Sequence, residues 1–126
     1  MTAEVEVVGD ALPAERVHDL VTLALASAGV ADGHLAVEFV DAGRIAALNA
    51  EHRGKDEPTD VLSFPVDESG PSHGPRELGD VVICPEHTAD LEEAVVHGVL
   101  HLVGMDHETD HGEMLALQAE ILGWMR

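Results

Sequence analysis

Three histidines between positions 97 and 107 constrain this chain more than any other feature. His97 and His101 are four residues apart, so on a helix their side chains lie on one face, one turn apart. Gly104 can adopt the left-handed conformation that ends a helix, which allows His107 to turn back toward the other two. Three neutral imidazoles that converge in this way form a metal site with one coordination position open for water or substrate. Such an open position is typical of catalytic sites.

Each histidine alone has a simpler explanation, because a single histidine on an apolar helix is usually a core residue. The chain has nine histidines, so one pair at this spacing could arise by chance. Three of them around an otherwise apolar helix favour metal binding. We expect one zinc ion per chain, because imidazole suits zinc, and nickel, iron and copper stay open as alternatives. Cys84 could be a fourth ligand, although a buried strand cysteine is the simpler interpretation.

The residue after the first histidine excludes one class of zinc enzyme. Metalloproteases with the H-E-x-x-H motif carry a glutamate there as general base. This chain has Gly98 at that position, although its spacing H-x3-H-x2-G-x2-H is that of the long metzincin signature. The segment therefore indicates a zincin-like scaffold used for other chemistry. Asp106 could orient the third histidine, but a turn residue is the simpler interpretation.

The length of 126 residues and the hydrophobic content of 45% predict a single globular domain spanning residues 1–126. No apolar run approaches the roughly 18 residues of a membrane span, and the acidic N-terminal segment lacks the apolar region of a signal peptide. A single cysteine excludes an intrachain disulfide. We therefore expect a cytoplasmic protein without a membrane partner.

The formal net charge of −19, from 25 acidic and six basic residues, is extreme. A nucleic-acid-binding protein usually has a basic footprint, and this chain as a whole would repel RNA. Three of the six basic residues nevertheless lie within twelve positions: Arg44, Arg53 and Lys55. They could form a local positive site on an acidic body. On the residues alone, Arg53 is more simply a solvated cation at a helix C-terminus, where cations are favoured.

Apolar periodicity and chain-breaking residues predict an α+β fold. Alternating or continuous apolar runs indicate strands at 4–8, 35–40, 61–66 and 78–84, and the last is apolar enough to be central. Apolar stripes at helical spacing indicate helices over about 13–29, 42–52 and 91–103, and after a capping pair of Asp110 and Glu113. Pro65 predicts that its strand lies at an edge or ends there.

This order of elements predicts a mixed, roughly four-stranded sheet that is flanked by helices. The metal site would lie on the helix over 91–103 and on the turn that follows it, with that helix packed on one face of the sheet. Asp41 and Asp90 are the expected N-caps of the helices that follow them. The segment 67–76 is rich in Gly, Pro and Ser and predicts a loop.

Three blocks of the sequence resemble the bacterial YbeY family. They are the histidine segment, the stretch from Leu48-Asn49 through Arg53 into Pro58-Thr59-Asp60-Val61-Leu62-Ser63-Phe64-Pro65, and the stretch Leu78-Gly79-Asp80-Val81-Val82-Ile83-Cys84. The blocks span most of residues 48–107 and occur in the order of the family. YbeY proteins are zinc-dependent single-strand endoribonucleases that act in ribosomal RNA maturation, at the 3′ end of 16S rRNA, and in ribosome quality control.

The resemblance implies that His97, His101 and His107 are the zinc ligands and that Arg53 is a catalytic residue. It also implies single-stranded RNA, the 16S rRNA precursor, as substrate, and the small ribosomal subunit with its associated factors as partners. Two alternatives stay open: a metal-dependent hydrolase of another substrate, and a non-catalytic ribosome-associated factor.

The chain departs from the family pattern in one place. Family members usually carry a longer, largely helical insertion before the helix with the histidines, whereas here only the twelve residues 85–96 separate Cys84 from His97. We therefore expect a shortened wall on one side of the site.

Overall fold

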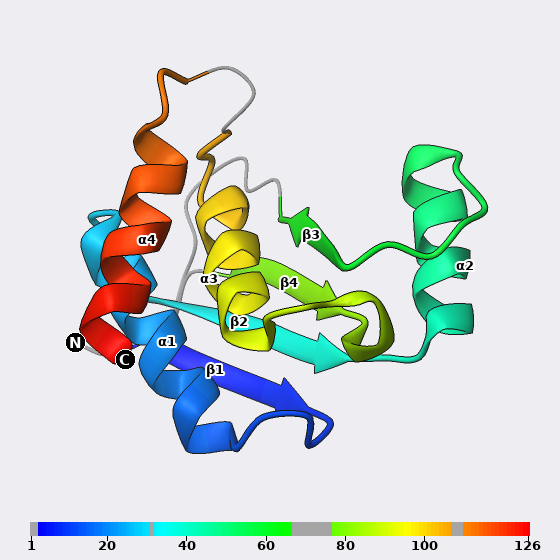
Figure 1. Ribbon diagram of the computed structural model, residues 1–126, viewed down its shortest axis with the longest axis horizontal. Helices are drawn as coiled ribbons and strands as arrows, with labels where there is room; N and C mark the ends of the chain where they lie inside the picture. The colour runs from blue at the N-terminus through cyan, green and yellow to red at the C-terminus, as the bar shows by residue number, and fades with distance from the viewer. Residues whose placement is uncertain (1–2, 31, 67–76, 107–109) are drawn as a thin grey trace.

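A mixed four-stranded sheet carries the helices of this protein (Figure 1). The computed structural model describes residues 3–30, 32–66, 77–106 and 110–126. In these ranges the elements are, in chain order, β1 (Ala3–Val8), α1 (Ala14–Ser27), β2 (Gly33–Phe39), α2 (Ala42–Arg53), β3 (Val61–Pro65), β4 (Glu77–Ile83), the 3-10 helix η1 (Pro85–His87), α3 (Leu91–Leu102) and α4 (Glu113–Met125). The predicted α+β class and order of elements are confirmed. The expected loop over 67–76 lies outside the described residues.

The strands have the order β1-β2-β4-β3. The first three of these are mutually parallel, and β3 runs antiparallel to β4. β4 is therefore central, as its apolar sequence predicts. β3 lies at an edge of the sheet and ends at Pro65, so the missing N–H of that proline falls where the sheet stops.

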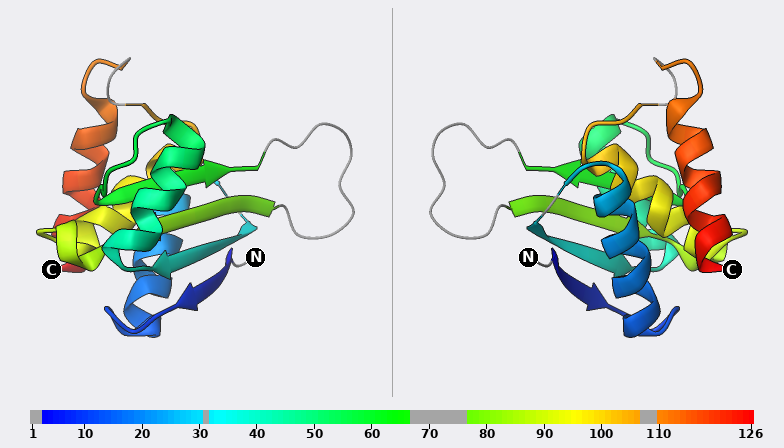
Figure 2. Two further views of the ribbon diagram at one scale, coloured as in Figure 1. Left: turned by 90° about the vertical axis from the view of Figure 1, so that its right-hand side faces the viewer. Right: turned by 90° about the vertical axis from the view of Figure 1, so that its left-hand side faces the viewer.

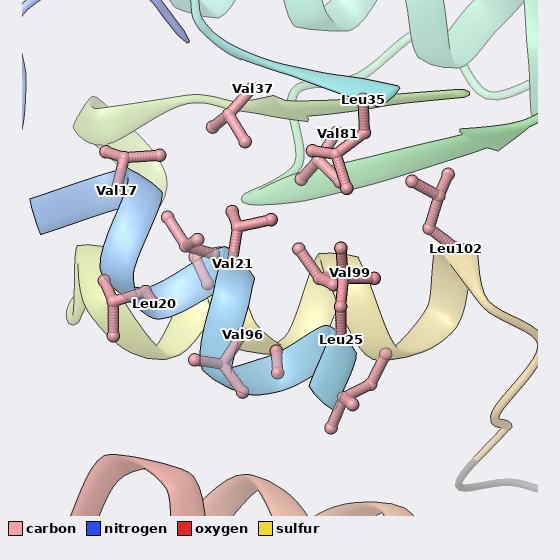
Figure 3. Close-up of a cluster of buried hydrophobic side chains, with 14 of the residues drawn as sticks. Val17, Leu20, Val21, Leu25, Leu35, Val37, Val81, Val96, Val99 and Leu102 are labelled. Atoms are coloured by element: carbon pink, nitrogen blue, oxygen red, sulfur yellow. The ribbon is translucent and has the colours of Figure 1, made fainter. Parts of the chain in front are cut away.

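The two faces of the sheet are covered by different helices. α1, α3 and α4 pack together over one face, whereas α2 stands apart from them, over the other face beside β3 (Figures 1 and 2). The main core lies between the sheet and the first group, where Val21 of α1, Val99 of α3 and Val81 of β4 are fully buried (Figure 3). A smaller cluster joins Ile45 of α2 to the opposite face.

Helix α3 is the innermost of the helices, because it contacts β3, β4, α1 and α4. Its nearly all-apolar sequence predicts this burial, and the buried runs 94–96 and 98–100 confirm it. No helix of the described ranges is long and apolar enough to cross a membrane.

Side chains cap α2 and α3 as the sequence predicts. A side-chain oxygen of Asp41 accepts a hydrogen bond from the N–H of Arg44 at 2.7 Å, before α2. Asp90 accepts one from the N–H of Glu93 at 3.2 Å, before α3. Each bond satisfies a backbone donor that the first turn of a helix leaves unpaired. Both helices therefore begin where their caps place them.

The predicted capping pair of Asp110 and Glu113 is wrong. The N-cap of α4 is Gly112, which has a φ of +97°, and Glu113 is the first residue of the helix. Asp110 accepts instead from the N–H groups of Gly112 at 2.8 Å and Met114 at 2.9 Å. Its two oxygens thus stabilise the turn and the first helical residues together, so the helix starts two residues later than the pattern suggests.

An ion-pair network ties α1, α3 and the end of α4 together. Arg126 donates to both oxygens of Asp90 at 2.6 Å and to Glu92 at 3.1 Å. Arg16 also binds Glu92 and donates to the carbonyl oxygen of Met125 at 2.8 Å. The hydrogen bond from Arg126 lowers the pKa of Asp90, and the one from Arg16 lowers the pKa of Glu92. The folded state therefore favours both carboxylates in their charged form.

We predict that Arg126→Met lowers the Tm at pH 7 and that this difference from the native protein narrows below about pH 4. A carboxyl whose pKa is lowered by folding stabilises the fold above its unfolded pKa. That contribution is lost as the pH falls through the folded pKa. Thermal unfolding from pH 7 to pH 3 measures the effect.

Arg44→Met is the matched control, because it removes the same charge from an exposed arginine. Arg44 forms no ion pair with another described residue. Equal losses of Tm in the two variants at pH 7 would contradict a specific contribution from the network.

Candidate active site

A cleft of about 490 Å³ lies between the C-terminal end of α2, strand β3 and helix α3. Its lining residues are His52, Arg53, Thr59, Asp60, Val61, Leu62, Ser63, Pro65, His97, His101 and Asp106. The cleft therefore brings together two of the three predicted metal ligands and the predicted catalytic arginine, which the sequence separates widely. Cys84 is fully buried in the smaller core cluster beneath α2 and is not among the lining residues.

The two histidines of α3 lie side by side, as their spacing predicts. The ring centroids of His97 and His101 are 4.7 Å apart, with the ring planes inclined at 68°. Gly104 has a φ of +99° and ends the helical segment, and the N–H of Met105 donates back to the carbonyl oxygen of Leu100 at 3.0 Å. The end of the helix at Gly104 is confirmed.

His107, the third predicted ligand, lies outside the described residues. Among the described residues, no three His, Cys, Asp or Glu side chains are grouped as a metal site. Asp106 lines the cleft, and its carbonyl oxygen accepts from the N–H of Asp110 at 3.1 Å. The role of His107 as a ligand stays a prediction.

Sequence reasoning missed one residue that contacts the site. Oε1 of Gln118, on α4, lies 2.8 Å from Nδ1 of His97, and the Gln118 residue is only 8% exposed. A signal was present, because Gln118 is the one polar residue among the buried positions of α4, which also include Met114 and Ile121. A polar side chain within an apolar stripe predicts a buried hydrogen bond, although not the partner.

The end of α2 presents Arg53 to the cleft. Arg53 is the last residue of the helix, and Gly54 ends it with a φ of +74° and donates to the carbonyl oxygen of Ala50 at 3.0 Å. Asn49 is buried, and its Nδ2 donates to the carbonyl oxygen of Glu57 at 2.9 Å. This bond ties the loop after the helix back to α2, so Arg53 is exposed at a defined turn.

Three cations of the described residues form no ion pair, and one of them, Arg53, lines the cleft. Arg44, Arg53 and Lys55 are exposed and form no ion pair within the described ranges. Arg16 and Arg126, by contrast, belong to the network around α3. Arg44 and Lys55 are not among the lining residues, so a positive site formed by all three cations stays a prediction.

Gly98 places α3 close to the sheet. A Cβ at this position would lie 2.4 Å from Cγ1 of Val81 and 3.2 Å from Cγ2 of Val61. The carbonyl oxygen of Gly98 accepts from the hydroxyl of Ser63 at 2.8 Å, which joins α3 to β3. Position 98 therefore faces the sheet, and a metalloprotease glutamate does not fit there without moving the helix.

The wall before α3 is short, as expected. Only η1 and a few flanking residues separate the end of β4 from Leu91. A second hollow of about 240 Å³ opens here and shares Asp60, Val61 and His97 with the cleft. His97 therefore borders both hollows.

The comparisons with known proteins agree with this fold. The sequence model of the family described as endoribonuclease YbeY matches residues 9–126. An endoribonuclease YbeY of Salinispora tropica is 44% identical over 116 aligned residues, covering 73% of this chain and 74% of the relative. One of Bacillus cytotoxicus is 39% identical over 129 residues, covering 85% and 83%. The solution structure of a Thermotoga maritima protein gives a TM-score of 0.58 at 26% identity, covering 96% of this chain and 88% of that one.

These matches define a class, the hydrolytic nucleases that cleave RNA internally. The chain belongs to the endoribonuclease YbeY family. In both alignments the aligned length exceeds the part of this chain that it covers, so the relatives carry residues that this chain lacks. A shortened segment before α3 agrees with that difference.

We predict that Gly98→Ala lowers the free energy of unfolding by about 1–3 kcal/mol, because the methyl group must push α3 away from β4. Urea unfolding measures the change. Gly123→Ala is the matched control, since Gly123 lies on α4 with nothing within 4 Å of an added Cβ. That variant should gain up to about 1 kcal/mol from helix propensity. A stable Gly98→Ala protein would show that the close approach is not a constraint.

Proposed function

We propose that this chain is a zinc-dependent single-strand endoribonuclease, with residues 1–126 acting as one domain. It would act in the cytoplasm on the 16S rRNA precursor, in maturation of the 3′ end and in ribosome quality control, together with the small ribosomal subunit and its factors. The observation that carries the proposal is the shared cleft, which holds His97, His101 and Arg53. Membership of the YbeY family supports the choice of RNA.

The residues present fit a zinc ion. His97 and His101 offer two imidazoles from adjacent turns of one helix, with their rings in contact. The hydrogen bond of Gln118 to Nδ1 of His97 supplies the kind of outer contact that orients metal-binding histidines. His107, the third predicted ligand, would complete the set. Zinc held by these residues would supply a Lewis acid for the scissile phosphate and would activate water.

Arg53 would bind the non-bridging oxygens of that phosphate. A guanidinium matches two phosphate oxygens with parallel N–H donors and keeps its charge at any relevant pH. Arg53 is exposed in the cleft and forms no ion pair with another described residue, so its guanidinium is available to a phosphate, although Asp60 and Asp106 also line the cleft. In this scheme Arg53 stabilises the charge that develops on the oxygens as the phosphodiester breaks.

Metal analysis of the native protein and of His97→Ala tests the metal site. We expect about one zinc per native chain, and loss of both zinc and single-stranded RNA cleavage in the variant. His18→Ala, at an exposed histidine of α1 outside the cleft, should keep both. Native protein without metal would overturn the site. Zinc without cleavage would favour the non-catalytic ribosome-associated factor.

Arg53→Ala tests the role of the arginine. We expect zinc content to be unchanged and kcat for single-stranded RNA to fall roughly 100-fold, the loss typical when one transition-state donor is removed. Arg44→Ala is the control, because it removes the same charge from the same helix outside the cleft.

Unchanged cleavage by Arg53→Ala would sink the scheme. A substrate panel of single-stranded RNA, duplex RNA, single-stranded DNA and a small phosphoester decides between a ribonuclease and a hydrolase of another substrate.

A further inference from the structure

We propose that Gln118 is a positioning residue, which holds the proton of the His97 ring on Nδ1 and so keeps Nε2 as the nitrogen that binds metal. This inference rests on the metal site proposed above. Gln118 lies on α4 and is not among the residues that line the cleft. It therefore acts through His97 and not on the substrate.

The hydrogen bond favours one tautomer of His97. A glutamine Oε1 can only accept, so the 2.8 Å contact with Oε1 pairs with a hydrogen on Nδ1 of His97. In the neutral ring the lone pair is then on Nε2. Without this acceptor the proton can occupy either nitrogen, and part of the population presents the wrong one.

The burial of Gln118 indicates that its amide is present for the hydrogen bond with His97. Moving an amide out of water without a partner costs on the order of 1–3 kcal/mol, so a buried glutamine is favoured only where it is hydrogen-bonded. The neighbouring buried positions of α4 include Met114, Ile121 and Leu122, all apolar. An apolar residue of similar size at 118 would fill the same space, so packing alone does not require an amide.

A second buried amide, that of Asn49, also supports a segment next to the cleft. Among the described residues, Asn49 and Gln118 are the two polar side chains in the buried class. Asn49 fixes the loop that follows Arg53, and Gln118 contacts His97. Both buried amides of the described chain therefore support elements of the same cleft, from opposite sides of the sheet.

Gln118→Met and Gln118→Glu form the decisive pair. Methionine keeps the size and removes the acceptor, whereas glutamate keeps an acceptor oxygen. Nitrogen-15 NMR of the histidine side chains in metal-free protein reports the His97 tautomer, and competition with a chromophoric chelator reports the zinc affinity. Met114→Leu, one turn earlier in the same buried stripe, controls for packing, and the Tm of each variant confirms folding.

We expect a single Nδ1–H tautomer of His97 in the native protein and a mixture in Gln118→Met, with zinc affinity about 10-fold lower or more. Gln118→Glu should restore both the tautomer and most of the affinity, while Met114→Leu should change neither. An unchanged tautomer and affinity in Gln118→Met, or an equal loss of affinity in Gln118→Glu, would overturn the positioning role. Failure of the proposed metal site would appear separately, as an absence of zinc binding by the native protein.

Discussion

The close approach of α3 to the sheet at Gly98 is the constraint on which the site depends. Because no side chain stands between the helix and Val81, the backbone of α3 can accept a hydrogen bond from Ser63 of β3. His97 and His101 flank this contact on the same helix, so both rings are held beside β3 at the edge of the sheet. The packing of the core and the position of the histidines thus have one cause.

The two polar residues in the buried class among the described residues, Asn49 and Gln118, form hydrogen bonds with segments next to the same cleft. The core between the sheet and α1, α3 and α4 is otherwise apolar among the described residues. The side-chain amides of Asn49 and Gln118 lose their contact with water on folding, and each forms one hydrogen bond within the protein. A buried amide without that hydrogen bond would be strongly unfavourable. The two buried hydrogen bonds therefore fix the loop after α2 and the ring of His97, while apolar packing stabilises the remainder of the core.

Much of the fold follows from the sequence because the signals are local. Alternation locates the strands, Pro65 predicts the end of an edge strand, and the four-residue spacing predicts the contact of His97 and His101. Non-local features escape this reasoning. Gln118 is 21 positions from its partner on another helix. In the sequence, Gly98 shows only that the general base of a metalloprotease is absent. Its role in packing becomes visible only once the structure places Val81 of the sheet against it. The predicted N-cap of α4 is wrong because Asp110 accepts a hydrogen bond from Gly112, which is itself the N-cap residue.

The distribution of charge leaves an unpaired arginine of the described residues, Arg53, in the cleft of an otherwise acidic chain. Arg16 and Arg126 form ion pairs with Asp90 and Glu92 at the start of α3. The unpaired cations of the described residues are then Arg44, Arg53 and Lys55. At physiological ionic strength the Debye length is about 8 Å, so the net charge of −19 acts weakly across the molecule, while a cation in the cleft acts at contact distance. The acidic body also gives little long-range attraction for nucleic acid. Recognition of the proposed RNA substrate would then depend on short-range contacts in the cleft and not on general electrostatic attraction.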